Sequence, residues 1–378
     1  MKLLMITGDR ALAQGKKGAF YYTLEEFSKY WERIDVVCPK VHQTSNPEPL
    51  TKIFGNVFIH SSCCPLIFQP FFIYKKGKEI FKEQKFNLFT VHSYPPFYND
   101  LGGLWLYKSI GKPYVSEVHH ITGYPRAGSF KEKIYRFLTL KLIKFFTNKA
   151  KAVRVVNQKQ VPEFLLGSGL KMDKIKYIPS AYIDLEIFKP ENAEKKYDLV
   201  FSGRLTKNKG IMLLLKTISN IKKQMPNIKI IIIGSGPLEN RIKNYIKQSQ
   251  LEDNIELSGW LPNMEDLAKI YNRSKILVMP SFNEGGPRVC LEAMACKTSI
   301  ITTKVGIMPD IIQDGENGLF IDWSAKDIAE KIMLLLKDEN LRSKIAENGY
   351  HTAQQFERKK MIKNYAETYQ NLLYSSGV

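Results

Sequence analysis

Two glutamates eight positions apart frame a glycine-rich segment in the second half of the sequence. Glu284 and Glu292 lie in SFNEGGPRVCLEAMACK, and between them stand Gly285, Gly286 and Pro287. Glycines let backbone N–H groups approach a ligand closely, and proline is a natural first residue of a helix. A carboxylate accepts two hydrogen bonds from a vicinal diol. The segment predicts Glu292 on a ribose and Glu284 on a second polyol; a capped helix with a solvated glutamate is the alternative.

Cations follow a predicted strand earlier in the same half. In LVFSGRLTKNKG the strand is followed, before the next helix, by Gly203, Arg204, Lys207 and Lys209. Ligands of open α/β sheets bind at the carboxyl ends of strands, and helix N-termini carry unpaired N–H groups. Arg204 and Lys209 therefore suit a diphosphate, although a basic surface loop has the same pattern.

Two further loops carry weaker signals. IIIIGSGPLENRI places Gly234 and Gly236 after a strand, and LSGWLPN places Trp260 and Leu261 after the next one. A backbone edge at the second loop could read a nucleobase. Plain connecting loops fit the same residues about as well.

Short apolar runs rich in β-branched residues alternate with amphipathic stretches. This alternation predicts parallel sheets with helices on both faces. Twelve strands are more than one open sheet usually holds. The irregular stretch Tyr177–Asp198 divides them into two doubly wound α/β domains. One long helix is expected at Ala353–Leu373. The expected strands are Lys2–Thr7, Ile34–Cys38, Val57–Ile59, Asn87–Val91, Pro113–Val118, Ala152–Val156, Asp198–Ser202, Ile228–Ile233, Asn254–Leu257, Ile276–Met279, Ser299–Thr302 and Gly318–Ile321.

The composition is that of a globular protein with a strong positive charge. The 378 residues are 44% hydrophobic and 25% charged, with a formal charge of +19. Such a field attracts nucleic acid, an anionic membrane or nucleotide phosphates. No apolar run is long enough for a transmembrane helix, and the five cysteines show no metal-ligand spacing, which favours a reduced cytoplasmic protein.

A basic amphipathic segment lies in the first half. KEKIYRFLTLKLIKFFTNKAK, residues 131–151, has seven Lys or Arg and one acid, with an apolar stripe at Leu138, Leu142, Phe145 and Phe146. Such a helix can lie on an anionic membrane or can pack its stripe on a sheet with its lysines in water. CCPLIFQPFFIYKKGK, from Cys63, adds apolar and basic residues in the same half.

Together, SGRLTKNKG, IIGSGP, LSGWLPN, MPSFNEGGPRVCLEAMACK and VGIMPDIIQDGENGLF resemble the retaining glycosyltransferases of family 4, the group 1 glycosyltransferases, which have the GT-B fold. The resemblance covers nearly all of residues 175–375. One departure is Gly-Pro-Arg after the first Glu-Gly, where the family often has Phe-Gly-Leu. The resemblance implies two Rossmann-like domains facing across a cleft: an acceptor domain at 1–180, a nucleotide-sugar domain at 181–355, and a C-terminal helix at 356–378 that crosses back.

The resemblance also implies roles by position. Arg204 and Lys209 match the residues on the donor diphosphate, Glu292 the one on the ribose and Glu284 the one near the donor sugar. His119 in KPYVSEVHHITGYP matches a histidine that approaches the donor sugar, with His120 as a substitute. The implied catalytic residues are His119, Arg204, Lys209 and Glu284. The implied donor-binding residues are Gly18, Gly203, Arg204, Lys209, Gly234, Gly236, Trp260, Leu261, Glu284, Gly285, Gly286, Pro287 and Glu292.

The function that the resemblance implies is retaining transfer of a hexosyl unit from a UDP-sugar or GDP-sugar to a glycan or lipid-linked acceptor. The expected setting is cell-envelope polysaccharide or glycolipid synthesis, in the cytoplasm or at the cytoplasmic face of the membrane. No Asp-x-Asp pair occurs, so no metal or other cofactor is expected, and cations would stabilise the leaving diphosphate. The alternatives are a sugar-nucleotide epimerase or sugar-phosphate synthase on the same fold, or a basic nucleic-acid-binding protein, for which charge is the one argument.

Overall fold

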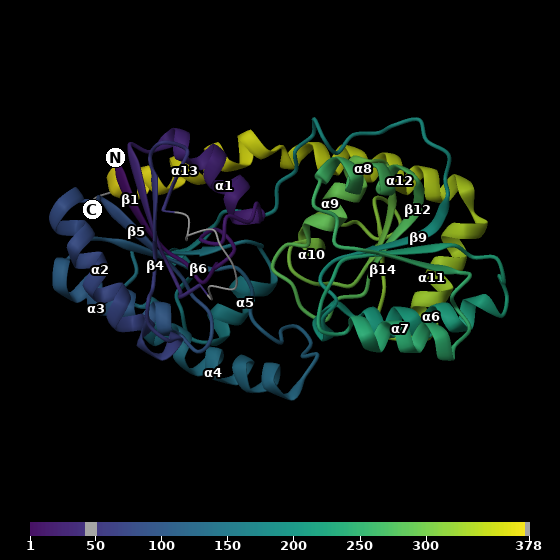
Figure 1. Ribbon diagram of the computed structural model, residues 1–378, viewed down its shortest axis with the longest axis horizontal. Helices are drawn as coiled ribbons and strands as arrows, with labels where there is room; N and C mark the ends of the chain where they lie inside the picture. The colour runs from purple at the N-terminus through teal and green to yellow at the C-terminus, as the bar shows by residue number, and fades with distance from the viewer. Residues whose placement is uncertain (42–50, 375–378) are drawn as a thin grey trace.

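Two parallel sheets, each covered by helices on both faces, make up the molecule (Figure 1). This computed structural model describes residues 1–41 and 51–374. The two sheets lie in separate domains that face each other across a cleft. The predicted architecture of two doubly wound α/β domains is therefore confirmed.

The N-terminal sheet has the strand order β3-β4-β2-β1-β5-β6-β7-β8, and all neighbours are parallel except β3 and β4. Helices α1 and α13 cover one face, and α2 to α5 cover the other. The elements in chain order are β1 Lys2–Ile6, α1 Ala19–Phe27, β2 Arg33–Cys38, β3 Lys52–Ile53, β4 Val57–Ser61, α2 Gln69–Gln84, β5 Leu88–His92, α3 Tyr98–Ile110, β6 Tyr114–Val118, α4 Phe130–Thr147, β7 Ala152–Val155, α5 Gln160–Gly167 and β8 Ile175–Tyr177.

The C-terminal sheet has the order β11-β10-β9-β12-β13-β14. Its central strands are apolar and buried on both faces, as parallel strands must be when helices cover both sides. The elements are β9 Tyr197–Ser202, α6 Ile211–Lys222, β10 Ile230–Ile233, α7 Glu239–Gln248, β11 Ile255–Gly259, α8 Met264–Asn272, β12 Ser274–Met279, α9 Arg288–Ala295, β13 Ser299–Thr302, α10 Met308–Ile311, β14 Leu319–Phe320, α11 Ala325–Lys337 and α12 Glu339–Ala353.

In each sheet the strand order reverses beside the first strand of the domain. β1 lies between β2 and β5, and β9 lies between β10 and β12. Ligands of doubly wound sheets bind at the carboxyl ends of strands next to such a reversal. The carboxyl ends of the two sheets therefore define where a site is expected.

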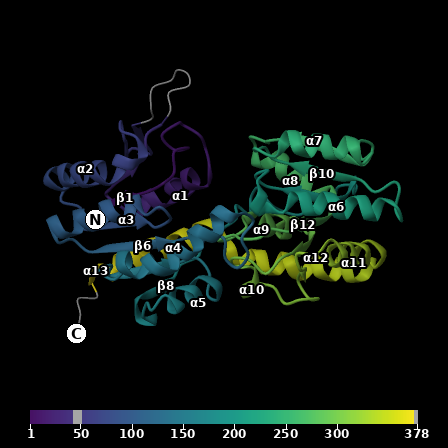
Figure 2. The same cartoon turned by 90° about the horizontal axis from the view of Figure 1, so that it is seen from below.

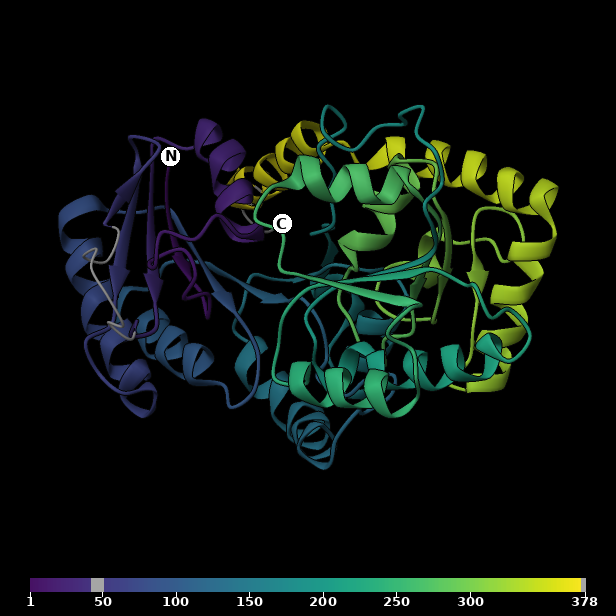
Figure 3. The ribbon, with the colours of Figure 1, turned by 45° about the vertical axis from the view of Figure 1, so that its right-hand side comes forward.

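The prediction of one continuous helix at Ala353–Leu373 is wrong near its start, where the helix is interrupted. A short 3-10 turn at Gln354–Phe356 follows α12, and α13 begins only at Arg358 and runs to Tyr374. Ile183 makes the break: its N–H donates to Phe356 O, and its carbonyl accepts from Arg358 N. The linker therefore pairs with the chain at this point, and α13 then packs on the N-terminal domain (Figures 2 and 3).

Two short strands were not anticipated. β3 is a two-residue edge strand, and β8 ends at Tyr177, the first residue of the stretch expected to be an irregular linker, so the irregular part begins after Tyr177. The remaining strands coincide with the predicted ranges to within a few residues. Within residues 1–41 and 51–374, no helix combines the length and apolar character needed to cross a bilayer.

Candidate active site

Glycines allow the loops after β9 and β10 to pack backbone against backbone. Gly203 and Gly234 have φ angles of +152° and +132°, in a region that favours glycine. A Cβ on Gly234 would overlap the carbonyl of Gly203, and one on Gly236 would lie 2.6 Å from the carbonyl oxygen of Leu205. These predicted glycines therefore hold the two loops together at the carboxyl edge of the sheet.

The loops after β9 and β12 bring a cation and an acid into contact. Nζ of Lys209 forms an ion pair with Oε1 of Glu284, although the residues are 75 positions apart. The hydroxyl of Ser281 donates to the same carboxylate oxygen at 3.0 Å. The neighbouring Arg204 is exposed, and within residues 1–41 and 51–374 its side chain has no hydrogen-bond or ion-pair partner. Arg204 and Lys209 therefore lie on one loop, and Lys209 contacts Glu284.

Glu292 lies on the second turn of α9, at the same edge of the sheet. It is half-buried, and its Oε2 accepts a hydrogen bond of 3.4 Å from the hydroxyl of the fully buried Tyr271. Burial raises the pKa of Glu292 to about 7, against the opposing charge of Arg288. A carboxyl group with this pKa gains or loses its proton near neutral pH. Its charge therefore responds to a hydrogen-bond donor that approaches it.

The Gly-Gly-Pro segment between the two glutamates meets the N-terminal domain. A Cβ on Gly285 would overlap the carbonyl oxygen of His119, whereas Gly286 has room for one. Pro287 is the N-cap residue of α9, one position before the helix start predicted for it. Gly285 is thus one of the points at which the two domains touch.

His119 follows β6 and is hydrogen-bonded to a buried acid of that strand. Its Nε2 lies 3.1 Å from Oε2 of Glu117. Burial alone would raise the pKa of Glu117, but the charge of Arg154 and the hydrogen bond from His119 hold it well below its usual range. Because an ionised carboxylate can only accept, Nε2 of His119 donates this hydrogen bond to Glu117.

His120 occupies a different environment from its neighbour. Burial lowers the pKa of His120, the charge of Glu284 opposes this effect, and Lys209 adds to it. His120 therefore lies in the field of the C-terminal loops. His119 faces the N-terminal side, with its ring centroid 4.3 Å from that of His92.

A cavity of about 260 Å³ lies at the base of the cleft on the N-terminal side. It is smaller than typical ligand pockets of roughly 300–1,000 Å³, so it suits only part of a substrate. Of the predicted site residues, His119 alone lines it. Polar side chains from β1 to β7, the linker and α9 contribute to the wall: Asp9, His92, Glu117, Arg154, Ser180 and Arg288.

The remaining predicted residues lie further apart. Trp260 is 70% exposed after β11, and Leu261 packs partly on the core of the C-terminal domain. Gly18 precedes α1, and its N–H donates to Lys16 O at 2.9 Å, so in this conformation it is occupied within its own loop. Nothing lies within 4 Å of a Cβ placed on Gly18.

The loop between β6 and α4 bridges the cleft. Nδ2 of Asn283 donates to Arg126 O at 3.0 Å and to Oε2 of Glu132 at 2.9 Å. The N–H of Arg126 donates to Phe282 O at 3.2 Å. The segment that carries His119 is therefore fastened to the loop that carries Glu284.

Sequence reasoning missed three charged residues of the cleft. Glu117 and Arg154 are register partners on β6 and β7, and Arg288 stacks 3.8 Å from the ring centroid of Tyr182 and donates to Ser180 O. The sequence signals that could have identified them were an acid and a base inside two predicted strands, and the arginine in Gly-Pro-Arg. In the part of the chain that the structure describes, no group of three His, Cys, Asp or Glu residues could hold a metal ion.

Fold and loops together define a glycosyltransferase of the GT-B class, and comparison with known proteins agrees. The family model "Glycosyl transferases group 1" matches residues 183–352, which make up most of the C-terminal domain. An uncharacterised glycosyltransferase of Methanocaldococcus jannaschii is 27% identical over 303 residues, which are 79% of each chain. The protein is thus an enzyme that transfers a sugar from a nucleotide sugar.

Another relative and two solved structures are also similar. N,N'-diacetylbacillosaminyl-diphospho-undecaprenol alpha-1,3-N-acetylgalactosaminyltransferase of Campylobacter jejuni is 27% identical, covering 65% of this chain and 66% of the relative. Sucrose-phosphate synthase from Thermosynechococcus elongatus superposes over the full length of both chains with a TM-score of 0.84 at 19% identity. HepE from Anabaena, in complex with UDP-glucose, covers 98% of this chain and 100% of its own, with a TM-score of 0.76 at 18% identity. At such identities the structures establish the fold.

Proposed function

We propose that this enzyme is a retaining hexosyltransferase that moves a sugar from a UDP-sugar or GDP-sugar to a lipid-linked or glycan acceptor, in cell-envelope polysaccharide or glycolipid synthesis. The observation that carries the proposal is the Lys209–Glu284 ion pair at the carboxyl edge of the C-terminal sheet, on the loop that also carries Arg204. These residues place positive charge for a diphosphate, and a hydrogen-bond acceptor for sugar hydroxyls, on adjoining loops. The name of the Campylobacter relative includes a diphospho-undecaprenol, which supports the lipid-linked acceptor.

The donor would lie across the loops after β9 to β12. Arg204 and Lys209 bind the diphosphate, and Glu292 accepts hydrogen bonds from the ribose diol. The diphosphate competes with Glu284 for Lys209, which releases Glu284 to accept from the donor sugar. The exposed Trp260 and the backbone at Leu261 lie where a base can stack or be read.

Transfer then proceeds on one face of the sugar. The bond from the anomeric carbon to the diphosphate oxygen breaks, and the acceptor hydroxyl oxygen bonds to the same face of that carbon. The acceptor proton passes to an oxygen of the leaving phosphate. Arg204 and Lys209 balance the charge that develops there, so no metal is needed. His119 approaches the sugar from the N-terminal side.

The decisive test is product analysis with UDP-glucose and GDP-mannose as donors and a polyprenyl-diphosphate sugar as acceptor. We expect free nucleoside diphosphate, and an NMR coupling constant that shows the anomeric configuration of the donor in the product. Turnover in EDTA should equal turnover in Mg²⁺. A product of inverted configuration would overturn the retaining course, and an isomerised nucleotide sugar without a glycoside would indicate an epimerase.

The donor site has its own test. UDP and GDP should raise the melting temperature, since a ligand at 100 times its Kd stabilises the fold by about 2.7 kcal/mol. Glu292→Ala should remove most of this shift. Absence of any shift at millimolar UDP, GDP or ADP would contradict the proposed donor site.

A further inference from the structure

Helix α4 turns its large apolar side chains outward. It contacts the rest of the N-terminal domain through Thr139, Ile143 and Thr147, which are buried, while Phe130, Phe137 and Phe145 are 76%, 59% and 63% exposed. The normal surface helix of a globular protein shows the opposite arrangement. The threonine hydroxyls donate within the helix, to Tyr135 O and Ile143 O, so these small residues allow α4 to sit close to the domain. The predicted stripe is thus divided: Leu142 and Phe145 face solvent, and Leu138 and Phe146 are half-buried.

The exposed residues form one stripe along the helix. At 3.6 residues per turn, positions 130, 134, 137 and 145 lie within a narrow arc. Ile134 completes the set and is exposed as well. On the same geometry, Lys131 flanks one side of the stripe, Lys133 and Lys144 flank the other, and Lys141 lies within it.

The charge of this face is positive and is not neutralised nearby. Within residues 1–41 and 51–374, no salt bridge joins lysines 131, 133, 141 or 144 to an acid. Glu132, the acid of α4, turns toward the cleft, where its Oε2 accepts from Gly128 N and from Asn283. The outer face of α4 therefore presents aromatic and aliphatic side chains between ammonium groups.

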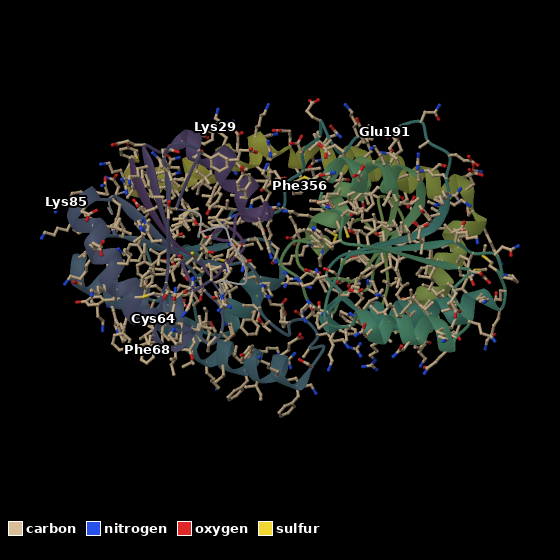
Figure 4. The ribbon with its side chains drawn as sticks, viewed as in Figure 1. Lys29, Cys64, Phe68, Lys85, Glu191 and Phe356 are labelled. Carbon is tan, nitrogen blue, oxygen red and sulfur yellow. The ribbon has the colours of Figure 1, made fainter. Side chains whose placement is uncertain are left out.

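A second exposed apolar group extends this face. Ile67, Phe68 and Phe71 are exposed in the short turn before α2 and in its first turn. Phe71 contacts Trp105 of α3, with ring centroids 5.0 Å apart. Helix α3 in turn packs against α4. Phe68 lies at the same lower edge of the domain as α4 (Figure 4). The face defined by α4 and residues 67–71 is called the basic apolar face below.

We infer that the basic apolar face binds the surface of an anionic phospholipid bilayer. Aromatic and aliphatic side chains with flanking lysines are the features of helices that lie in the lipid interface. A second copy of this chain is a poorer partner, because an isologous contact would bring the same lysines together in a protein of charge +19. Anionic headgroups complement that charge.

The location of the face gives it a purpose within the proposed function, on which this part rests. α4 begins directly after the loop that carries His119 and bridges the cleft through Arg126 and Asn283. An enzyme lying on the bilayer through α4 therefore places the cleft beside the membrane. A lipid-linked acceptor could then reach His119 with its isoprenoid chain still in the bilayer.

The test measures binding of the full chain to vesicles by flotation. We expect binding to phosphatidylcholine vesicles containing about one third phosphatidylglycerol, much weaker binding to phosphatidylcholine alone, and release at high salt. Phe137→Ser/Phe145→Ser should reduce the partition coefficient by roughly tenfold or more. The matched control, Leu334→Ser/Tyr374→Ser, removes two exposed apolar side chains elsewhere and should bind like the wild type.

Three results would overturn the inference: no binding to anionic vesicles, equal binding by the Phe137→Ser/Phe145→Ser variant, or a wild-type dimer in light scattering that this variant makes monomeric. The last would identify the face as a contact between copies. Hydrolysis of the nucleotide sugar in the absence of vesicles reports separately on the donor site. If hydrolysis persists while vesicle binding fails, the membrane inference fails and the proposed chemistry stands.

Discussion

The hydroxyl of Tyr365 donates a hydrogen bond of 2.6 Å to Oε1 of Glu117, 248 positions earlier in the chain. Tyr369, one turn later on α13, donates to the same oxygen at 2.5 Å. Arg154 lies 3.5 Å from the other oxygen of Glu117 and 3.8 Å from the ring centroid of Tyr365. The last helix is thereby fastened to the strand that precedes His119, through a charge that is buried and fully paired.

Removing this charge should destabilise the N-terminal domain. Glu117→Gln keeps the size of the side chain but leaves Arg154 buried without an anion. Breaking a buried ion pair costs roughly 3–5 kcal/mol. We therefore expect the free energy of unfolding at pH 7, measured by urea denaturation, to fall by about that amount. Glu32→Gln, an exposed acid of the same domain, should change it little.

The same variant should alter the acid side of the stability profile. The pKa of Glu117 in the folded protein is held below its unfolded value, so the stability that this group adds is present above the unfolded pKa. It is lost as pH falls through the lower, folded pKa. The difference between wild type and Glu117→Gln should therefore shrink steadily below pH 4 or so. A difference that stays constant down to acid unfolding would contradict the assigned ionisation.

Arg204 should contribute to turnover and not to folding. It is exposed, and among the described residues its side chain has no hydrogen-bond or ion-pair partner to lose, yet the proposed diphosphate site needs its charge. Arg204→Ala should lower kcat by roughly 10² to 10³, as loss of a preorganised donor does. The control is Lys207→Ala, which removes an exposed cation from the same loop. Equal effects of the two substitutions would point to a general field and not to a phosphate contact.

Nucleotide binding should weaken as pH falls through about 7, the value to which burial raises the pKa of Glu292. The ionised carboxylate accepts both ribose hydroxyls, whereas the protonated form must first lose its proton. Affinity for UDP should thus be about tenfold lower at pH 6 than at pH 8. Isothermal titration at both values measures it. The second ionisation of the phosphate also falls in this range, so Glu292→Gln supplies the baseline, and an unchanged profile in that variant would remove Glu292 as the cause.

Much of this site could be predicted because sequence order and sheet geometry are linked. A residue just after a parallel strand must lie at the carboxyl edge of the sheet, so Lys209 and Glu284 were each expected at this edge although 75 positions separate them; their ion pair was not predicted. The positions of Gly203 and Gly234 at this edge followed from the same rule, because each comes directly after a predicted strand. Alternating apolar patterns were sufficient for the two sheets because both are buried on each face.

The rest depends on distances that the sequence does not contain. Glu117 and Arg154 are charged residues inside strands, and their pairing requires the register of β6 against β7 as well as α13 from the far end of the chain. The break before α13 follows from a bridge to Ile183, a contact that helical periodicity does not reveal. The outward orientation of the α4 stripe could not be read from the sequence either, because both faces of that helix carry apolar residues.

The contact between Gly285 and His119 gives the most direct test of cleft closure. A Cβ at Gly285 would overlap the carbonyl oxygen of His119, so Gly285→Ala must push the two domains apart at this point. The donor loops after β9 and β10 are untouched, and UDP affinity by titration should therefore change little. Turnover should fall by roughly 10², since a displacement of about 1 Å in a reacting group has that effect. Gly167→Ala, where a Cβ meets nothing within 4 Å, is the matched control and should retain full turnover. If Gly285→Ala instead lost UDP affinity and kept its kcat, Gly285 would act on the donor itself and the closure of the cleft would have no part in the effect.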